Sequence, residues 1–120
     1  MSEKDQLNNQ CYLFQGKHYI ANFMDCDMMD LATIKREFEL AIIQSGATVL
    51  GKSDYVFDND GLTMVFLLSE SHASIHTYPE HKSVFIDFFT CGDNVDHAVF
   101  HDSIYKLFKP KKIKIQNLER

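Results

Sequence analysis

Residues 62–91 read LTMVFLLSESHASIHTYPEHKSVFIDFFTC, and this stretch decides the fold. It is rich in β-branched and aromatic residues, which suit a pleated sheet. Short breaks near Glu70 and at Pro79-Glu80 divide it into three segments of strand length. Such closely connected segments favour a largely antiparallel sheet. The predicted strands are 62–69, 72–78 and 83–91.

Three more segments show the two-residue period that a half-buried strand requires. In the first of them, Tyr19, Ala21 and Phe23 occupy alternate positions and are expected to face a core. These additional strands are predicted at 17–26, 48–57 and 112–117.

A helix is predicted between the first two of these strands, because apolar residues recur there at helical spacing. Ile34 and Phe38 fall on one face, while charged residues fall on the other. Asp27 or Asp30 offers an N-cap, and Gly46 supplies a C-terminal stop.

A second amphipathic helix follows Asp93 or Asp96, either of which can cap it, and ends before Pro110. The element order is then β-α-β-β-β-β-α-β. This order predicts the α+β class, as a two-layer α/β sandwich in which both helices cover one face of a largely antiparallel sheet. We expect a single domain at 16–120. Residues 1–15 are polar and lack any period, which predicts a flexible N-terminal tail.

Composition narrows the class of protein. The chain has 120 residues, of which 45% are hydrophobic, enough for one domain with an ordinary core. A formal net charge of −5 repels a phosphate backbone, so no nucleic acid is expected as a partner. No apolar run reaches the roughly 20 residues that span a bilayer, and residues 1–10 lack the apolar stretch of a signal peptide. We therefore expect a cytoplasmic protein with no membrane partner.

Alternate residues of segment 72–78 project one polar face: His72, Ser74, His76 and Tyr78. Such a face also fits the ordinary solvated side of an antiparallel sheet. A zinc site at His72, His76 and Cys91 is disfavoured, because two residues four positions apart on a strand are separated by about 13 Å. The cysteines include no CxxC pair, although Cys26 could approach from elsewhere in the fold. No metal is predicted.

The common catalytic motifs are absent, since no GxSxG elbow and no glycine-rich phosphate loop occurs. The Ser71 hydroxyl directly follows the Glu70 carbonyl and can attack it through a five-membered ring. Thr63 or His76 could stabilise the oxyanion if neighbouring strands bring them near Ser71. This local chemistry would cut the chain.

The run LLSESHASIHTYPEHKSVFIDFFTCGD, residues 67–93, resembles the active-site signature of the prokaryotic S-adenosylmethionine decarboxylase proenzymes. That signature is close to SESHxxIHTWPE followed by DxxTCG. Segments 16–27, 45–48 and 111–119 resemble other parts of the same family. The likeness therefore leaves out little besides the N-terminal tail.

The resemblance implies that the Glu70-Ser71 bond is cut to give a β chain, 1–70, and an α chain, 71–120. Ser71 would attack the Glu70 carbonyl to form an ester, and β-elimination followed by hydrolysis would leave a covalent pyruvoyl group. This self-generated cofactor would form a Schiff base with S-adenosyl-L-methionine and accept the electrons released with CO2. The product would be the aminopropyl donor for spermidine biosynthesis.

The resemblance also implies roles for individual residues. Cys91 matches the proton donor of decarboxylation, and His76 matches the histidine that removes the α-hydrogen during processing. Thr63 matches a hydroxyl that supports the processing intermediate. Aromatic residues would stack on adenine or attract the sulfonium, and a carboxylate would bind the ribose hydroxyls. The implied substrate-binding residues are Phe57, Tyr78, Glu80, Ser69 and Glu70.

Two departures from the family pattern lie on substrate-facing elements. Tyr78 stands where the family usually has tryptophan, which weakens a cation–π contact. The sequence FDND precedes Gly61 in place of a more apolar, proline-containing one. A pyruvoyl-dependent decarboxylase of arginine or ornithine, or an unprocessed regulatory homologue, therefore stays an alternative.

The size of the domain also bears on assembly. A single small sandwich offers little concave surface for a nucleoside, and members of the family place their sites between protomers. We therefore expect a homo-oligomer of processed protomers, (αβ)2 or larger.

Overall fold

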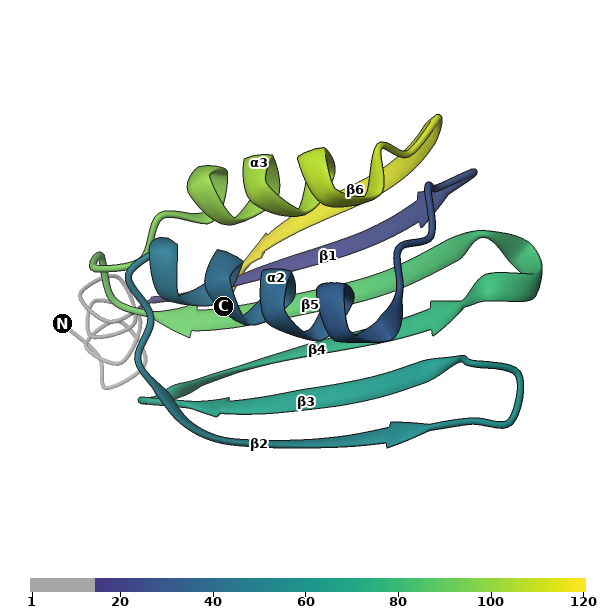
Figure 1. Cartoon of the computed structure of the whole chain (residues 1–120). Coiled ribbons are helices and arrows are strands. Elements are labelled where there is room, and N and C mark those ends of the chain that lie inside the picture. Colours follow the sequence, from purple (N-terminus) through teal and green to yellow (C-terminus); the bar gives the residue numbers. More distant parts are fainter. Residues whose placement is uncertain (1–14) are drawn as a thin grey trace, which may run out of the picture.

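The computed structural model describes residues 15–120, so the tail predicted at 1–15 lies almost wholly outside the described residues. One six-stranded sheet carries two helices on the same side (Figure 1), which confirms the predicted two-layer α+β sandwich. None of the helices within 15–120 is long and apolar enough to cross a membrane. The elements are β1 (Gly16–Met24), α2 (Leu31–Gln44), β2 (Val49–Val56), β3 (Leu62–Leu68), β4 (Ser71–Tyr78), a 3-10 turn (Pro79–His81), β5 (Ser83–Cys91), α3 (His97–Phe108) and β6 (Lys112–Glu119).

The strand order across the sheet is β2-β3-β4-β5-β1-β6, and all neighbouring strands are antiparallel. The first strand of the chain thus lies inside the sheet, between β5 and β6. The turn between β3 and β4 and the end of β5 lie at one end of the sheet, on the left in Figure 1. The loops that follow β2 and β4 lie at the other end, on the right.

Local side-chain contacts fix the helix ends. The Asp30 carboxylate accepts a hydrogen bond from the Thr33 backbone N–H at 3.2 Å and begins α2. Asp96 caps α3 in the same way. Gly46 follows α2 with φ of 105°, and a Cβ there would lie 2.5 Å from the Asn94 carbonyl oxygen. Glycine is therefore required where the chain leaves α2.

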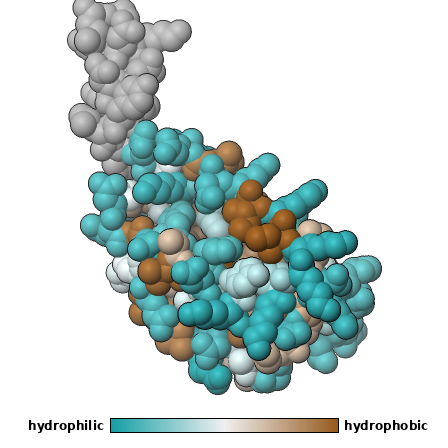
Figure 2. Space-filling view, turned by 90° about the horizontal axis from the view of Figure 1, so that it is seen from above, coloured by the Kyte–Doolittle hydropathy of each residue, from teal (hydrophilic) through white to brown (hydrophobic). Residues whose placement is uncertain are grey.

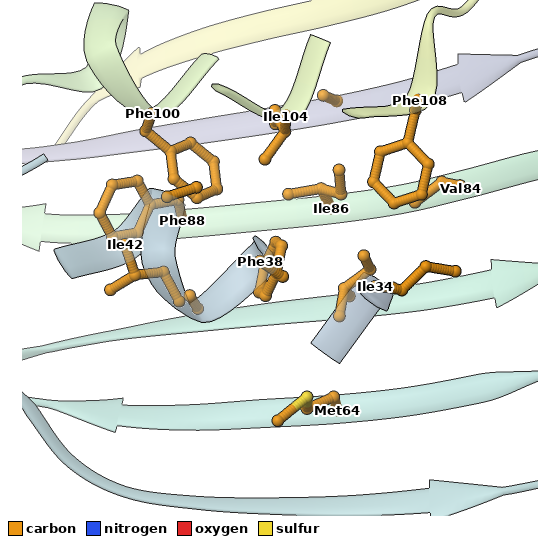
Figure 3. Packing of buried hydrophobic residues seen from close by; sticks show 14 of the residues in the cluster. Ile34, Phe38, Ile42, Met64, Val84, Ile86, Phe88, Phe100, Ile104 and Phe108 are labelled. Atoms are coloured by element: carbon orange, nitrogen blue, oxygen red, sulfur yellow. The ribbon is translucent and has the colours of Figure 1, made fainter. Parts of the chain in front are cut away.

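The core lies between the helices and the sheet and is built from aromatic contacts. The ring of Phe100 on α3 lies 4.3 Å from the ring of Phe88 on β5, centroid to centroid. Phe38 on α2 contacts Phe100 at 5.8 Å and Phe66 on β3 at 5.7 Å. Figure 3 shows the helix residues Phe38 and Phe100 pointing toward the sheet. Through these contacts both helices pack against the central strands.

The opposite face of the sheet carries no helix (Figure 1), and we call it the open face. On the side seen in Figure 2, hydrophobic residues form only small groups among hydrophilic ones. The open face, by contrast, exposes large apolar side chains on most of its strands. They are Tyr55, Val65, Leu67, Tyr78, Phe85 and Leu118.

Replacing Phe100 with alanine tests the core. Phe100 is fully buried, so we expect Phe100→Ala to lower the free energy of unfolding by about 3–5 kcal/mol. The neighbouring Val99 is exposed, and Val99→Ala should cost under about 1 kcal/mol. Urea denaturation followed by circular dichroism measures both values. Equal losses in the two variants would contradict the packing described above.

Candidate functional site

A cavity of about 450 Å³ lies at the end of the sheet that carries the loops after β2 and β4. Five of the residues singled out in the sequence line it, together with the loop residues Asp58, Asn59 and Gly61. These five come from the residue that follows β2, from β3, from β4 and from the 3-10 turn. They are Phe57, Thr63, His76, Tyr78 and Glu80.

Thr63 and His76 form a pair at the inner edge of this cavity. They are register partners on β3 and β4, and Thr63 Oγ1 lies 3.0 Å from His76 Nδ1. The hydroxyl donates when Nδ1 carries no proton, whereas it accepts when Nδ1 is protonated, which leaves the Nε2 lone pair free. Both side chains are partly buried. The pair can therefore exchange protons with a group held above the open face.

Glu80 is held by a residue that the sequence did not single out. Asn59 Nδ2 donates a hydrogen bond to Glu80 Oε2 at 2.9 Å, and Asn59 Oδ1 accepts one from the Gly61 N–H at 2.9 Å. The backbone contact fixes which end of the amide faces Glu80. A Cβ on Gly61 would lie 2.9 Å from Asn59 Oδ1, so the glycine leaves room for this contact. The Asn-Asp-Gly sequence was recognisable only as a turn signal.

Exposed aromatic rings surround the cavity. Phe57 is 49% exposed and contacts Tyr55 at 4.9 Å, and Tyr78 is 39% exposed and contacts Phe85 at 5.2 Å. Rings that are this exposed are available to stack on a planar or cationic ligand.

The predicted cleavage point lies at the opposite end of the sheet. Ser69 and Glu70 form the two-residue turn between β3 and β4, and Leu68 pairs with Ser71. Glu70 has φ of 60°, the left-handed region that normally favours glycine. Holding a non-glycine residue there costs roughly 1–2 kcal/mol. The Glu70-Ser71 bond therefore lies in an exposed, strained turn.

Cys91 ends β5 at this same end of the sheet. Cys91 pairs with Gly16 on β1. It lies two positions after Phe89, which is the register partner of His72 on β4. Its side chain is partly exposed, and it carries no disulfide. The adjacent strands β4 and β5 thus bring Ser71 and Cys91 to the same end of the sheet.

One expectation about the site is wrong within a single chain. Neighbouring strands do pair Thr63 with His76, but they do not bring this pair near Ser71. Ser71 and His76 are five positions apart on one extended strand, which separates them by about 16 Å. The structure therefore divides the predicted residues into two half-sites, one at each end of the sheet.

A hydrogen-bonded cluster that sequence reasoning missed lies on the open face between the half-sites. Asp87 Oδ2 lies 2.9 Å from His18 Nε2 and 3.2 Å from His72 Nε2, and Asp87 Oδ1 accepts a hydrogen bond from the Ser74 hydroxyl. Burial raises the pKa of the Asp87 carboxyl. The effect of burial is outweighed by hydrogen bonds from Ser74 and His18 and by the charge and hydrogen bond of His72. The pKa of Asp87 therefore lies below its usual value.

His18, His72 and Asp87 of this cluster form the one group of three or more potential metal ligands within residues 15–120. Their ligand atoms lie within 4.8 Å of one another. Two observations favour a hydrogen-bonded cluster over a metal site. Asp87 already accepts from both imidazoles, and Arg120 Nη1 lies 3.5 Å from His18 Nδ1. The guanidinium repels a cation and donates to Nδ1, so the proton of His18 lies on Nε2.

Comparison with known proteins identifies the family. The S-adenosylmethionine decarboxylase family model matches residues 17–120. S-adenosylmethionine decarboxylase proenzyme 2 of Bacillus cereus is 40% identical, with 88% of each chain covered. The proenzyme of Thermotoga petrophila is 35% identical over 88% of this chain and 83% of that protein.

A solved structure agrees with these sequence relatives. The crystal structure of the adenosylmethionine decarboxylase from Aquifex aeolicus superposes with a TM-score of 0.79, at 33% identity, over 88% of this chain and 89% of that one. With a family model matched along nearly the whole described chain and relatives similar in both sequence and fold, the protein belongs to the S-adenosylmethionine decarboxylase family.

Proposed function

We propose that this protein cuts its own chain at Glu70-Ser71 and then decarboxylates S-adenosyl-L-methionine with the pyruvoyl group made from Ser71. The observation that carries the proposal is the exposed two-residue turn that holds Glu70 at φ of 60°, directly before the serine that opens β4. Self-cleavage converts that turn into two chain ends and relieves its strain.

Processing needs only side chains of this protein and one water molecule, which hydrolyses the dehydroalanine left by elimination at residue 71 to the pyruvoyl group and releases ammonia. The Ser71 hydroxyl attacks the Glu70 carbonyl carbon, the peptide C–N bond breaks, and Glu70 becomes esterified to Ser71 Oγ. Thr63 supplies a hydroxyl for the oxyanion, and His76 takes the α-hydrogen of residue 71 in the elimination that breaks the ester. The hydrogen bond between Thr63 and His76 supports this joint role when Nδ1–H donates to Thr63 Oγ1, because the hydroxyl proton is then free for the oxyanion and the Nε2 lone pair is free to take the α-hydrogen.

In decarboxylation, a pyruvoyl group supplies an electrophilic ketone that captures the substrate amine and accepts the electrons released with CO2. Cys91 returns a proton to the α-carbon. Phe57 and Tyr78 stack on adenine or contact the sulfonium, while Glu80 accepts hydrogen bonds from the ribose hydroxyls. Ser69 and Glu70 contact the substrate beside the reacting carbon. The product is the aminopropyl donor for spermidine biosynthesis.

The two half-sites become one site if the active form pairs two copies, at least an (αβ)2 dimer. A two-fold axis that runs parallel to the sheet on its open-face side, perpendicular to the strands, would pack the open faces together and reverse one copy end to end. Ser71 and Cys91 of one copy would then approach Thr63 and His76 of the other. The apolar side chains exposed on the open face support such packing.

Decarboxylation of arginine or ornithine is the second candidate activity, because Tyr78 replaces a stronger cation–π partner. The Glu80 carboxylate, supported by Asn59, could accept hydrogen bonds from a ribose diol or pair with the cationic side chain of arginine or ornithine, so the substrate assay separates the two candidates. The regulatory-homologue alternative requires an intact chain.

Replacing Ser71 with alanine tests self-cleavage. We expect intact mass measurement to find wild-type protein as two fragments, with a new N-terminus trapped by borohydride in the presence of substrate. Ser71→Ala should stay full-length, because it lacks the attacking oxygen. Ser103→Ala, at a partly exposed serine on α3, is the matched control and should be cut normally. Full-length wild-type protein that releases no CO2 would refute the proposal, whereas CO2 release from arginine or ornithine alone would refute the substrate.

Co-expression of two inactive variants tests the shared site. Alone, Ser71→Ala and His76→Ala chains should both stay uncut. In a mixed dimer, one site would combine the intact Ser71 of one copy with the intact His76 of the other. Random pairing then predicts cleavage of roughly half of the His76→Ala chains, because half enter mixed dimers. No cleavage in mixed dimers that are isolated with two affinity tags would show that each site lies within one chain.

Removing the Asn59 side chain tests how the ribose is bound. Asn59→Ala leaves Glu80 without its amide partner, and we expect KM for S-adenosyl-L-methionine to rise about 3–10-fold with kcat little changed. Asn59→Asp keeps an acceptor for the Gly61 N–H but places a second carboxylate beside Glu80, so it should raise KM at least as much. Unchanged steady-state constants in both variants would contradict this role.

A further inference from the structure

We propose that Asp87 is a positioning residue for the first residue of the α chain. Its carboxylate holds the outward side chains of His72 and Ser74 against β5, so that residue 71 keeps its place once the bond to Glu70 is cut. This inference rests on the proposed function, since it concerns a chain end that only self-cleavage creates.

The cut end has few other contacts to hold it. The register pairs Ser71 with Leu68 of β3, whereas pairing with β5 begins only at His72, opposite Phe89. Before cleavage, the Ser69-Glu70 turn ties residue 71 covalently to β3. After cleavage that tie is gone, and terminal residues without anchoring contacts fray.

Asp87 is placed to supply the missing anchor. His72 and Ser74 are the first two side chains of β4 that point to the open face, and one carboxylate bonds both. Oδ2 lies 3.2 Å from His72 Nε2, while Oδ1 accepts from the Ser74 hydroxyl. The His72 ring also lies 5.6 Å from the ring of Phe89, at 33° to it. The side chains of β5 thus hold both positions that follow residue 71.

His18 extends the anchor to a third strand. Its Nε2 lies 2.9 Å from Asp87 Oδ2, and its ring meets His72 edge to face at 5.9 Å. His18 and Asp87 are only 16% and 26% exposed, whereas His72 is 50% exposed. The more buried pair on β1 and β5 therefore holds the more exposed histidine. The Asp87 carboxylate, whose pKa lies below its usual value, is ionised at neutral pH, and its charge strengthens these hydrogen bonds.

This role predicts an asymmetry between the two reactions. Cleavage takes place while the turn still ties residue 71 to β3, so it should depend little on Asp87. Turnover takes place after the tie is lost, when a small displacement of the reacting carbonyl costs much of the rate. A residue that only stabilised the fold would affect both reactions together.

The test compares the two rates in Asp87→Asn, which keeps the size of the side chain and removes its charge. The rate of fragment appearance after synthesis in a cell-free system should stay within about 3-fold of wild type, while kcat of the cleaved enzyme should fall about 10-fold or more, with a smaller change in KM. Ser74→Ala should shift kcat the same way, and Ser74→Thr, which restores a hydroxyl, should recover it. His81→Gln, at an exposed histidine outside the cluster, is the control.

Amide hydrogen exchange provides a second readout that does not depend on activity. The amides of residues 72–74 should exchange faster in cleaved Asp87→Asn than in cleaved wild type, with no difference between the uncleaved Ser71→Ala forms that do or do not also carry Asp87→Asn. Unchanged kcat and exchange, or parallel loss of cleavage and turnover, would overturn the positioning role. A wild-type chain that is never cut would instead overturn the proposed function.

Discussion

The register between β3 and β4 is the constraint on which the rest of the site depends. Pairing Leu68 with Ser71 leaves two residues for the turn and holds Glu70 in its left-handed conformation. The same register pairs Thr63 with His76 at the far end and lets them share a hydrogen bond. A slip of one residue would move every side chain of β4 to the other face, so turn, pair and cavity would be lost together.

Most of the fold could be predicted from local periodicity. Tyr19, Ala21 and Phe23 alternate in the sequence, and all three are buried under the helices. The strand order could not be predicted that way, because it places β1 between β5 and β6 through contacts between distant parts of the chain. Periodicity reports which face a residue occupies, and the identity of the neighbouring strand is a property of the whole chain.

The same limit applies to the candidate site, several of whose residues could be selected from the sequence although their contacts could not. Residues within one signature, such as Ser71 and His76, could be selected from the sequence, but closeness in a motif does not mean closeness on a strand that rises about 3.3 Å per residue. His18 and Asp87 went unnoticed because 69 positions separate them in the chain. Asn59 went unnoticed because a turn sequence says nothing about what its side chain reaches. In each case the missing information was a contact between segments remote in sequence.

The strand order has a consequence for a molecule cut between β3 and β4. Reading across the sheet, β2 and β3 would belong to the first fragment, β4 and β5 to the second, β1 to the first and β6 to the second. Neither fragment forms a contiguous sheet of its own, because its strands alternate with those of the other fragment. The two fragments therefore stay associated as long as the native strand pairing persists. Unfolding such a nicked protein would release two separate polypeptides. Recovery would then become a bimolecular encounter that slows with dilution, although the intact precursor folds as a single chain.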